Sequence, residues 1–279
     1  MQGQVCVITG ATSGIGKAAA AALARQGAEV IVVGRDPGRT EATAAAIQAD
    51  GAPPPKVEIA DLACLDQVRA LAGRLDQTLD RIDVLINNAG LVLNERQVTP
   101  DGYEHVFAVN HLAPFLLTNL LRPKLTASAP ARVITVSSDA HTAARLDLDD
   151  PNLEHGWSSW RSYSNSKLAN ILFTRELARQ LDGTGVTANC VHPGVVRTGF
   201  GRDARPLMRI GIAIAKPFML SPERGADTIV YLASSPDVAA STGGYYVKRQ
   251  LREPSPAARD DGLARRLWTV SEDLTGLAS

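Results

Sequence analysis

The sequence lacks the features that mark several large classes of proteins. It has only 3 cysteines in 279 residues, far apart and without metal-ligand spacing, so we expect free thiols and no metal site. Basic and acidic residues number 29 each, a balance that gives no sign of a nucleic-acid or membrane-surface partner. No apolar run is long enough to span a bilayer, and the first residues do not resemble a signal peptide. We therefore expect a cytoplasmic protein without a membrane segment.

What the chain does contain is an alternation of apolar runs and longer helical patterns. Hydrophobic residues make up 45% of it, enough for a substantial core. Apolar runs predict buried strands at residues 5–9, 29–33, 56–59, 84–87, 132–137 and 187–191. Helical patterns follow the first strand and recur at 39–49, 65–77, 102–121, 163–181 and 259–274. This alternation predicts an α/β fold with a doubly wound parallel sheet, helices on both faces, and one domain over residues 1–279.

Two segments interrupt the alternation, and both follow the carboxyl end of a predicted strand, where open α/β sheets bind ligands. Residues 139–162 form a polar insert. Residues 197–222 combine glycines with a short apolar run and fit either a mobile lid over the substrate or a rigidly packed helix. Apolar side chains of both segments either line a lipophilic pocket or serve as core and loop anchors; they are Trp157, Trp160, Leu207, Met208, Ile212 and Phe218.

A glycine-rich turn joins the first strand to the first helix. Gly10 allows a tight turn, Gly14 lets the main chain approach a pyrophosphate, and Gly16 lets the helix pack close to the sheet. The turn directly follows an apolar strand and opens a helix, which favours dinucleotide binding over a chance run of glycines. The predicted cofactor contacts here are Gly10, Thr12, Ser13, Gly14, Ile15 and Gly16.

The end of the second strand predicts which dinucleotide is bound. An NAD site has a carboxylate there for the ribose 2′-hydroxyl, whereas this chain has Gly34 followed by Arg35. A guanidinium offers a planar fork of donors to a 2′-phosphate. The alternative is a solvated arginine on a loop. The sequence favours NADP(H) over NAD(H).

Tyr163 and Lys167 form the main candidate catalytic pair. They begin a predicted helix at positions i and i+4, so both lie on one helical face. An ammonium beside a phenol stabilises the phenolate, so we expect Lys167 to lower the pKa of Tyr163 and make it a usable acid and base. Ser137 and Ser138 end the preceding predicted strand and supply further hydroxyl groups.

The order of these motifs resembles the short-chain dehydrogenase/reductase family over nearly the whole chain. The matching motifs are TGxxxGxG at 9–16, Asp61-Leu62, NNAG at 87–90, Asn110, Ser138, Tyr163 with Lys167, and Pro193-Gly194. Stretches at 107–118, 163–179, 192–198 and 253–276 resemble the retinol dehydrogenase and WW-domain oxidoreductase branch. The resemblance implies a Rossmann-type sheet of about seven strands, NAD(P)-dependent hydride transfer, and a homodimer or homotetramer.

The resemblance also implies a role for each matching residue. Tyr163 would be the general acid of a reduction, Ser138 would bind the substrate oxygen, and Lys167 would hold the nicotinamide ribose. Asn110 would bend its helix and hold a water in a proton relay, and Pro114, which departs from the family pattern, would sharpen that bend. The other implied cofactor contacts are Asp61, Leu62, Asn88, Ala89, Gly90, Tyr163, Pro193, Val195 and Thr198.

The sequence therefore predicts an NADPH-dependent oxidoreductase that moves hydride between the nicotinamide and a carbonyl or alcohol carbon of a small lipophilic substrate. One alternative is reduction of a conjugated C=C or imine bond by the same residues. Another is a non-catalytic NADP(H)-binding sensor, although such proteins usually lose the catalytic Tyr, Lys or Ser. Among the histidines, His141 and His155 are candidates for substrate contact, and a structural role is predicted for His192.

Overall fold

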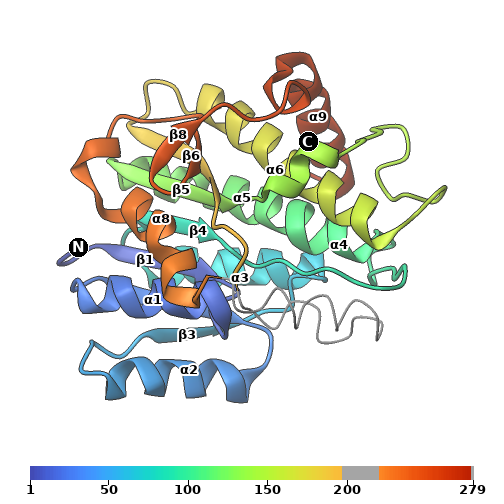
Figure 1. Cartoon of the computed structure of the whole chain (residues 1–279). Helices are drawn as coiled ribbons and strands as arrows, with labels where there is room; N and C mark the ends of the chain where they lie inside the picture. Colours follow the sequence, from blue (N-terminus) through green and yellow to red (C-terminus); the bar gives the residue numbers. More distant parts are fainter. Residues whose placement is uncertain (197–219, 278–279) are drawn as a thin grey trace.

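A mostly parallel sheet organises the computed structural model, which describes residues 1–196 and 220–277 (Figure 1). Its eight strands lie in the order β3-β2-β1-β4-β5-β6-β7-β8. Strands β1 to β7 pair in parallel and β8 pairs antiparallel with β7. The strands are β1 (Val5–Thr9), β2 (Glu29–Gly34), β3 (Lys56–Ile59), β4 (Val84–Asn87), β5 (Ala131–Val136), β6 (Val186–His192), β7 (Tyr245–Val247) and β8 (Gln250–Arg252). The predicted α/β Rossmann-type fold is confirmed.

The eighth strand is a difference from the expected count of about seven. A two-residue turn, Lys248 and Arg249, joins β7 to β8, with φ of 51° and 62°. Tight hairpin turns of this left-handed kind are usually built from Gly, Asn or Asp. The sequence carries no such turn signal here, so the hairpin could not be recognised from it.

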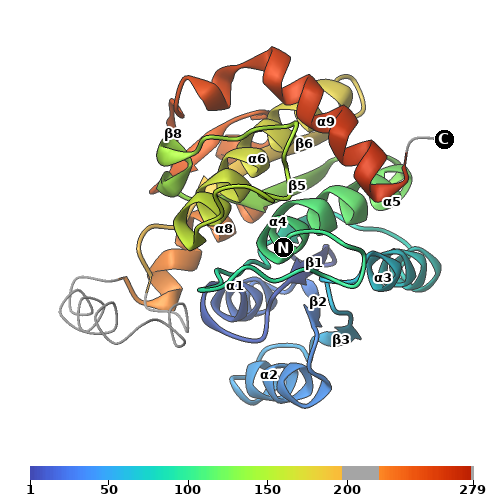
Figure 2. The same ribbon diagram turned by 90° about the vertical axis from the view of Figure 1, so that its right-hand side faces the viewer.

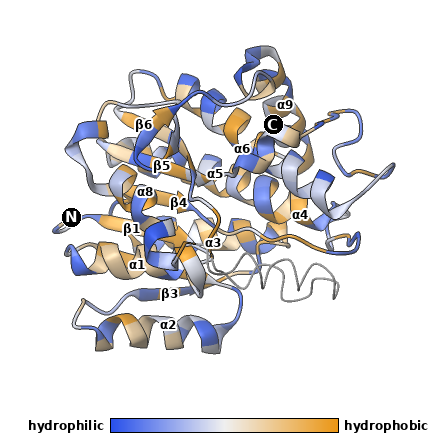
Figure 3. Cartoon of the chain, in the orientation of Figure 1, coloured by the Kyte–Doolittle hydropathy of each residue, from blue (hydrophilic) through white to orange (hydrophobic). Residues whose placement is uncertain are grey.

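Helices cover both faces of the sheet (Figure 2). One face carries α1 (Gly14–Arg25), α2 (Pro37–Ala49) and α8 (Pro222–Ser234); the other carries α3 (Leu65–Thr78), α5 (Ala113–Ala127), α6 (Ser159–Gln180) and α9 (Asp261–Thr275). Short 3-10 turns are η2 (Asp139–Ala143), η4 (Pro236–Val238) and η5 (Ala257–Arg259). Alternate strand residues feed two separate cores, Cys6 and Ile8 on one side and Val5 and Val7 on the other. The edge strand β3 is hydrophilic compared with the central strands (Figure 3).

The helix predicted at 102–121 is divided, and its predicted start is wrong. The short α4 (His105–Phe107) leads into a π-helical turn, η1 (Ala108–Leu112), and α5 follows. The N–H of Ala113 donates to the Ala108 carbonyl, five residues earlier, and Pro114 directly after it has no N–H to donate to the carbonyl of Asn110. The distortion expected near Asn110 therefore takes the form of a π turn.

The C-terminal helix α9 packs on α6 and extends the core on that face. The rings of Trp268 and Phe173 stack with centroids 5.9 Å apart, and Phe115 meets Trp268 edge-on at 4.8 Å. His111, fully buried in the π turn, lies 2.8 Å through Nε2 from the Ser271 hydroxyl of α9. Because that hydroxyl donates to the carbonyl of Leu267, His111 is the donor. Burial lowers the pKa of His111 to about 3, which keeps the ring neutral.

We expect this neutral ring to make folding stability depend on pH. The unfolded chain takes up the proton near pH 6.5, whereas the folded chain does so only near its pKa of about 3. The contribution of neutral His111 to folding stability is therefore fully present above pH 6.5, the pKa of the ring in the unfolded chain. It is lost as pH falls below that pKa, by about 1 kcal/mol between pH 6.5 and 5.5. Urea unfolding of the parent and of His111→Gln, which keeps a donor but does not titrate, measures this contribution. The variant should show a shallower pH slope, and the exposed control His155→Asn should not; equal slopes in all three would contradict it.

Candidate active site

The predicted site segments meet at one edge of the sheet, beyond the carboxyl ends of the parallel strands. In the strand order β1 lies between β2 and β4. The chain runs from β1 to β2 and β3 on one side and then crosses over to β4 on the other side, so the strand order reverses at β1. Open α/β sheets bind ligands in the crevice at such a switch point. The loops that leave β1, β4, β5 and β6 carry the glycine-rich turn, residues 88–90, Ser138 and Pro193 respectively.

The glycine-rich turn is shaped to hold a charged group close to the main chain. Gly10 has φ of 65°, and a Cβ there would lie 2.7 Å from Cα of Ala89. Gly14, with φ of 54°, begins α1, whose N-cap residue Ser13 makes no side-chain cap bond and whose first turn has no acidic residue. The N–H groups at this helix end are therefore available to an anion. These residues fit the pyrophosphate of a dinucleotide.

Thr9 and Asn88 tie this turn to the loop after β4. The Thr9 hydroxyl accepts the main-chain N–H groups of Asn88 and Ala89, both at 3.1 Å. The Asn88 amide donates back to the carbonyls of Thr9 at 2.8 Å and Gly10 at 3.1 Å. These bonds fix the two loops on either side of the switch point. Thr9 is absent from the predicted site residues because its contact reaches 79 residues along the chain.

Position 34, the last residue of β2, has no room for an acidic side chain. A Cβ at Gly34 would collide with the Thr40 hydroxyl and would lie 2.5 Å from the Thr12 methyl group. The nearby carboxylate of Asp36 caps the first turn of α2 by accepting a main-chain N–H at 2.8 Å. The Arg35 side chain is exposed beside them. This strand end offers an exposed guanidinium, and its carboxylate is already engaged.

Asp61 and Leu62 follow β3 on the same side of the sheet. The Asp61 carboxylate accepts the N–H of Ala63 at 3.0 Å, and its own N–H donates to the Gln67 side chain at 2.9 Å. Leu62 is buried. These contacts fix the turn to which the resemblance assigns the cofactor contacts of Asp61 and Leu62.

The hydroxyl groups of Ser138 and Tyr163 meet beyond the end of β5. The Ser138 side chain caps η2 by accepting the N–H of Ala140 at 3.2 Å and is also hydrogen-bonded to the Tyr163 hydroxyl. Ser137 is engaged elsewhere, since its buried hydroxyl donates to the carbonyl of Lys167 at 2.7 Å. The structure thus places Ser138, and not Ser137, beside Tyr163.

The structure corrects the expected effect of Lys167 on Tyr163. Burial raises the pKa of Tyr163, and the hydrogen bond with Ser138 lowers it by less. The Lys167 Nζ lies 5.5 Å from the centroid of the Tyr163 ring and donates to the Val136 carbonyl at 3.1 Å. Burial also lowers the pKa of Lys167 to about 8. The Lys167 Nζ lies close to Gly90, where a Cβ would be 3.4 Å from it. The phenol is therefore held protonated, the form that donates a proton.

Asn110 uses its side chain to join three segments of the site. Its Oδ1 accepts the N–H of Leu91 at 2.8 Å, and its Nδ2 donates at 3.0 Å to both the Leu91 carbonyl and the Ser166 hydroxyl. That hydroxyl donates to the carbonyl of Tyr163 at 2.7 Å. A water relay would therefore use the main-chain carbonyl of Asn110, whose usual helical donor is missing at Pro114.

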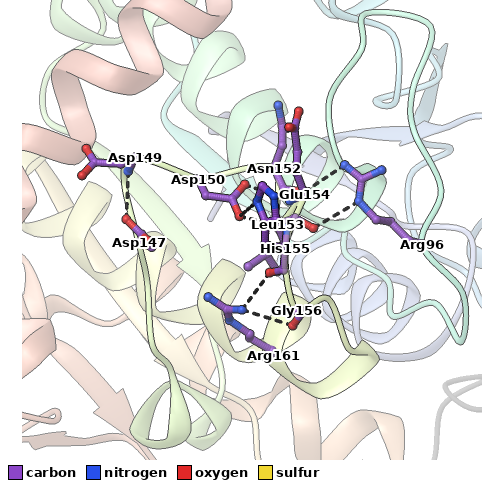
Figure 4. A network of polar contacts seen from close by, with 10 residues as sticks. All are labelled: Arg96, Asp147, Asp149, Asp150, Asn152, Leu153, Glu154, His155, Gly156 and Arg161. Atoms are coloured by element: carbon purple, nitrogen blue, oxygen red, sulfur yellow. Dashed lines mark hydrogen bonds and ion pairs between the residues drawn. The ribbon is translucent and has the colours of Figure 1, made fainter.

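Polar contacts hold the insert in place (Figure 4), and its last residues already belong to α6, which begins at Ser159 and not at 163 as predicted. Arg96, before α4, and Arg161, in α6, each donate to two main-chain carbonyls, which belong to Asn152, Leu153, His155 and Gly156. Asp150 accepts the N–H groups of Glu154 and His155 at 2.8 Å and 3.1 Å. The insert is therefore an ordered wall beside the start of α6.

The two tryptophans of the insert have different surroundings. The indole N–H of Trp157 donates at 3.1 Å to the buried carboxylate of Glu104, which also caps α4. Trp160 is 59% exposed, and its ring centroid lies 6.4 Å from that of Tyr163. Trp157 anchors the loop, whereas Trp160 borders Tyr163.

Residues after β6 complete the described part of this edge. Pro193 lies at the strand end, and Val195 is 64% exposed. The N–H of Leu220 donates to the Val195 carbonyl at 2.8 Å. Residues 197–219 lie outside the described residues; they include Thr198, all but the last three residues of the predicted lid at 197–222, and the four apolar side chains singled out in that segment.

Comparison with known proteins decides the family. A family profile described as short chain dehydrogenase matches residues 4–208. Retinol dehydrogenase 14 of Mus musculus is 45% identical over 294 residues, which cover 99% of this chain and 87% of that protein. The chain belongs to the short-chain dehydrogenase/reductase family. The predicted resemblance to the family and to retinol dehydrogenases is confirmed.

Other members of the family extend the comparison. A Streptomyces sp. (strain C5) protein named as a daunorubicin C-13 ketoreductase, DnrU, is 44% identical over 279 residues, covering 99% of this chain and 94% of its own. A crystal structure from Mycobacterium paratuberculosis matches with TM-score 0.81 and 38% identity, covering 99% and 94% of the two chains. The Pseudomonas aeruginosa RhlG/NADP complex matches with TM-score 0.72 and 27% identity, covering 95% and 97%. The protein is an NAD(P)-dependent oxidoreductase that acts on an alcohol or carbonyl group of a small molecule.

Within residues 1–196 and 220–277, no set of three or more His, Cys, Asp and Glu side chains is arranged to hold a metal ion. In the same ranges, none of the helices is sufficiently long and apolar to pass through a membrane.

Proposed function

We propose that the protein is an NADPH-dependent reductase of lipophilic aldehydes and ketones. The observation that carries this proposal is the meeting of the Ser138 and Tyr163 hydroxyls, with the Lys167 ammonium over the tyrosine ring. When bound, the nicotinamide supplies the hydride. Consumption of NADPH with a panel of lipophilic carbonyl compounds tests the proposal, and no consumption with any of them would favour the sensor alternative.

Tyr163 is the proton donor in this proposal. Its raised pKa keeps the phenol protonated, as reduction of a carbonyl requires. Negative charge develops on the carbonyl oxygen as hydride arrives, and two hydroxyl donors at one point stabilise that charge. Ser138 provides the second donor. Lys167, cationic below its pKa of about 8, adds positive charge and would hold the ribose.

The preference for NADP(H) rests on the end of β2. A carboxylate at Gly34 is excluded by the close approach of Thr12 and Thr40, and Asp36 is engaged as a helix cap. Arg35 is exposed beside these residues, where its guanidinium would pair with a 2′-phosphate. The relative whose structure is named as an NADP complex is consistent with this choice.

A lipophilic substrate is suggested by the names of the relatives and by the surface around Tyr163. Retinol and daunorubicin, the compounds named for two relatives, both carry a large apolar or aromatic portion. Trp160 presents an exposed indole one helical turn before Tyr163. An aromatic face next to the reacting group suits a ring-containing substrate.

Trp160→Ala should weaken selection for bulky substrates. We expect kcat/KM for an aromatic ketone to fall roughly tenfold relative to that for a small aliphatic ketone, because the lost contact is worth about 1.4 kcal/mol. The melting temperature should hardly change, since the side chain is 59% exposed. The matched control is Trp157→Phe, which removes the bond to Glu104 and should lower stability by about 1 kcal/mol without changing the substrate ratio. An unchanged ratio in Trp160→Ala would contradict the placement of the substrate.

A homodimer or homotetramer stays a prediction. The α9 helix packs along α6 through Trp268 and Phe173 and so occupies part of the outer surface of the helix that carries Tyr163. A dimer formed through the helices of Asn110 and Tyr163 would have to accommodate α9. Light scattering after gel filtration measures the state directly.

A further inference from the structure

The residue after Ser138 is held by side chains that the proposed reaction does not use. The N–H of Asp139 donates to Nδ1 of His192 at 3.3 Å, and one carboxylate oxygen of Asp139 lies 3.2 Å from Nε2 of the same ring. The other carboxylate oxygen accepts the Tyr245 hydroxyl at 2.7 Å. His192 ends β6 and Tyr245 begins β7, so two neighbouring strands hold Asp139 through both its main chain and its side chain.

A second histidine holds Ser138 itself. Nε2 of His141 accepts the N–H of Ser255 at 3.1 Å, so Nδ1 carries the proton and donates to the Ser138 carbonyl at 2.8 Å. The rings of His141 and Tyr245 lie 5.1 Å apart in a T-shaped arrangement. His141, His192 and Tyr245 are only 3%, 7% and 4% exposed, whereas the Asp139 side chain that His192 and Tyr245 contact is 64% exposed.

Each imidazole ring accepts a main-chain N–H and must be neutral to do so. Burial lowers the pKa of His192, and the negative charge of Asp139 raises it by less. Burial also lowers the pKa of His141. Neutral rings are therefore the stable form near neutral pH. With one nitrogen of each ring fixed as acceptor, the tautomer of each ring is fixed as well.

We propose that Asp139, His192 and Tyr245 are positioning residues that aim the Ser138 hydroxyl at the substrate oxygen. The proposal rests on the proposed role of Ser138. Strand β5 ends at Val136, so its regular pairing does not reach Ser138 or Asp139, and only a short 3-10 turn follows. The contacts from β6 and β7 supply the constraint that strand pairing does not. A donor displaced by about 1 Å loses much of its effect on the transition state.

Tyr245→Phe tests the proposal with the loss of one oxygen atom. We expect kcat for carbonyl reduction to fall roughly tenfold while the Kd for NADPH stays within about twofold, because Ser138 does not bind the cofactor. The matched control is Tyr246→Phe, on the same strand. It removes an equally buried hydroxyl, bonded at 2.6 Å to Ser241, and should keep the parental kcat. A parental kcat in Tyr245→Phe, or an equal loss in Tyr246→Phe, would overturn the proposal.

Two further comparisons separate positioning from simple stabilisation. In a Ser138→Ala background, Tyr245→Phe should cause no further loss of kcat, because the two residues act through one hydroxyl. His192→Asn, whose amide oxygen stands as many bonds from Cα as Nδ1 does, should retain much more activity than His192→Ala. Additive losses, or equal losses in the two His192 variants, would contradict the positioning role. A parental kcat in Ser138→Ala alone would instead refute the proposed role of Ser138.

Discussion

Replacement of Tyr163 by phenylalanine should lower kcat for carbonyl reduction at least about a hundredfold, the usual contribution of a positioned general acid. The change removes the phenol oxygen and keeps the ring that lies near Lys167 and Trp160. Ser138 would still contact the substrate oxygen but would have no partner to supply the proton. The Kd for NADPH should stay within about twofold, because the glycine-rich turn and Arg35 are unchanged.

Steady-state kinetics and fluorescence titration with NADPH measure both quantities. Tyr246→Phe controls for the loss of a buried tyrosine hydroxyl outside the catalytic group. Near-parental turnover in a folded Tyr163→Phe protein would show that another group donates the proton. A large loss of NADPH binding with an unchanged kcat at saturating NADPH would show that the hydroxyl holds the cofactor and does not donate the proton.

Arg35→Ala should weaken binding of NADPH by roughly 1.5–3 kcal/mol, the scale of a lost charge-assisted hydrogen bond. This corresponds to roughly a 10- to 150-fold higher Kd. Binding of NADH should change little, because it has no phosphate for the guanidinium to contact. The neighbouring Gly34 and Asp36 leave no carboxylate in position to hold a ribose 2′-hydroxyl, so the variant should not become a good NADH enzyme.

Titration of both cofactors into the parent and the variant gives the selectivity. Arg265→Ala, which removes an exposed arginine on α9, controls for the loss of one positive charge. Equal affinities of the parent for NADPH and NADH would contradict the assignment. An equal loss for both cofactors in Arg35→Ala would place the guanidinium at a phosphate that the two share.

The central strands and the glycine-rich turn could be predicted because their signals are local. Strands β1 and β4 are short runs of buried residues, and the predicted bounds at 5–9 and 84–87 match the structure. The π turn before α5 could not be predicted from the sequence pattern, because its hydrogen bonds depend on the conformation of the whole turn before Pro114. The β8 hairpin was equally hidden, since Lys248 and Arg249 stand where turn-forming residues are expected.

Within the site, the sequence identifies residues that belong to motifs and misses those that act across the fold. Tyr245 reaches Asp139 over 106 positions, a contact that exists only because β7 pairs with β6. Burial raises the pKa of Tyr163 and the hydrogen bond with Ser138 lowers it by less, so charge spacing along one helix predicts the direction of the shift wrongly. His192 was predicted to have a structural role. In the structure it contacts both the main-chain N–H and the carboxylate of Asp139.

Transfer of deuterium from NADPH labelled at the reactive nicotinamide carbon tests the central claim most directly. The substrate should be an aromatic enone, which offers both a C=O and a conjugated C=C bond, with each stereoisomer of the labelled cofactor tried in turn. The proposed function predicts that mass spectrometry and NMR find the label on the carbinol carbon of an allylic alcohol, with one NADPH consumed for each alcohol formed. Label on the carbon of a reduced C=C bond, or no transfer to any carbonyl compound, would contradict it.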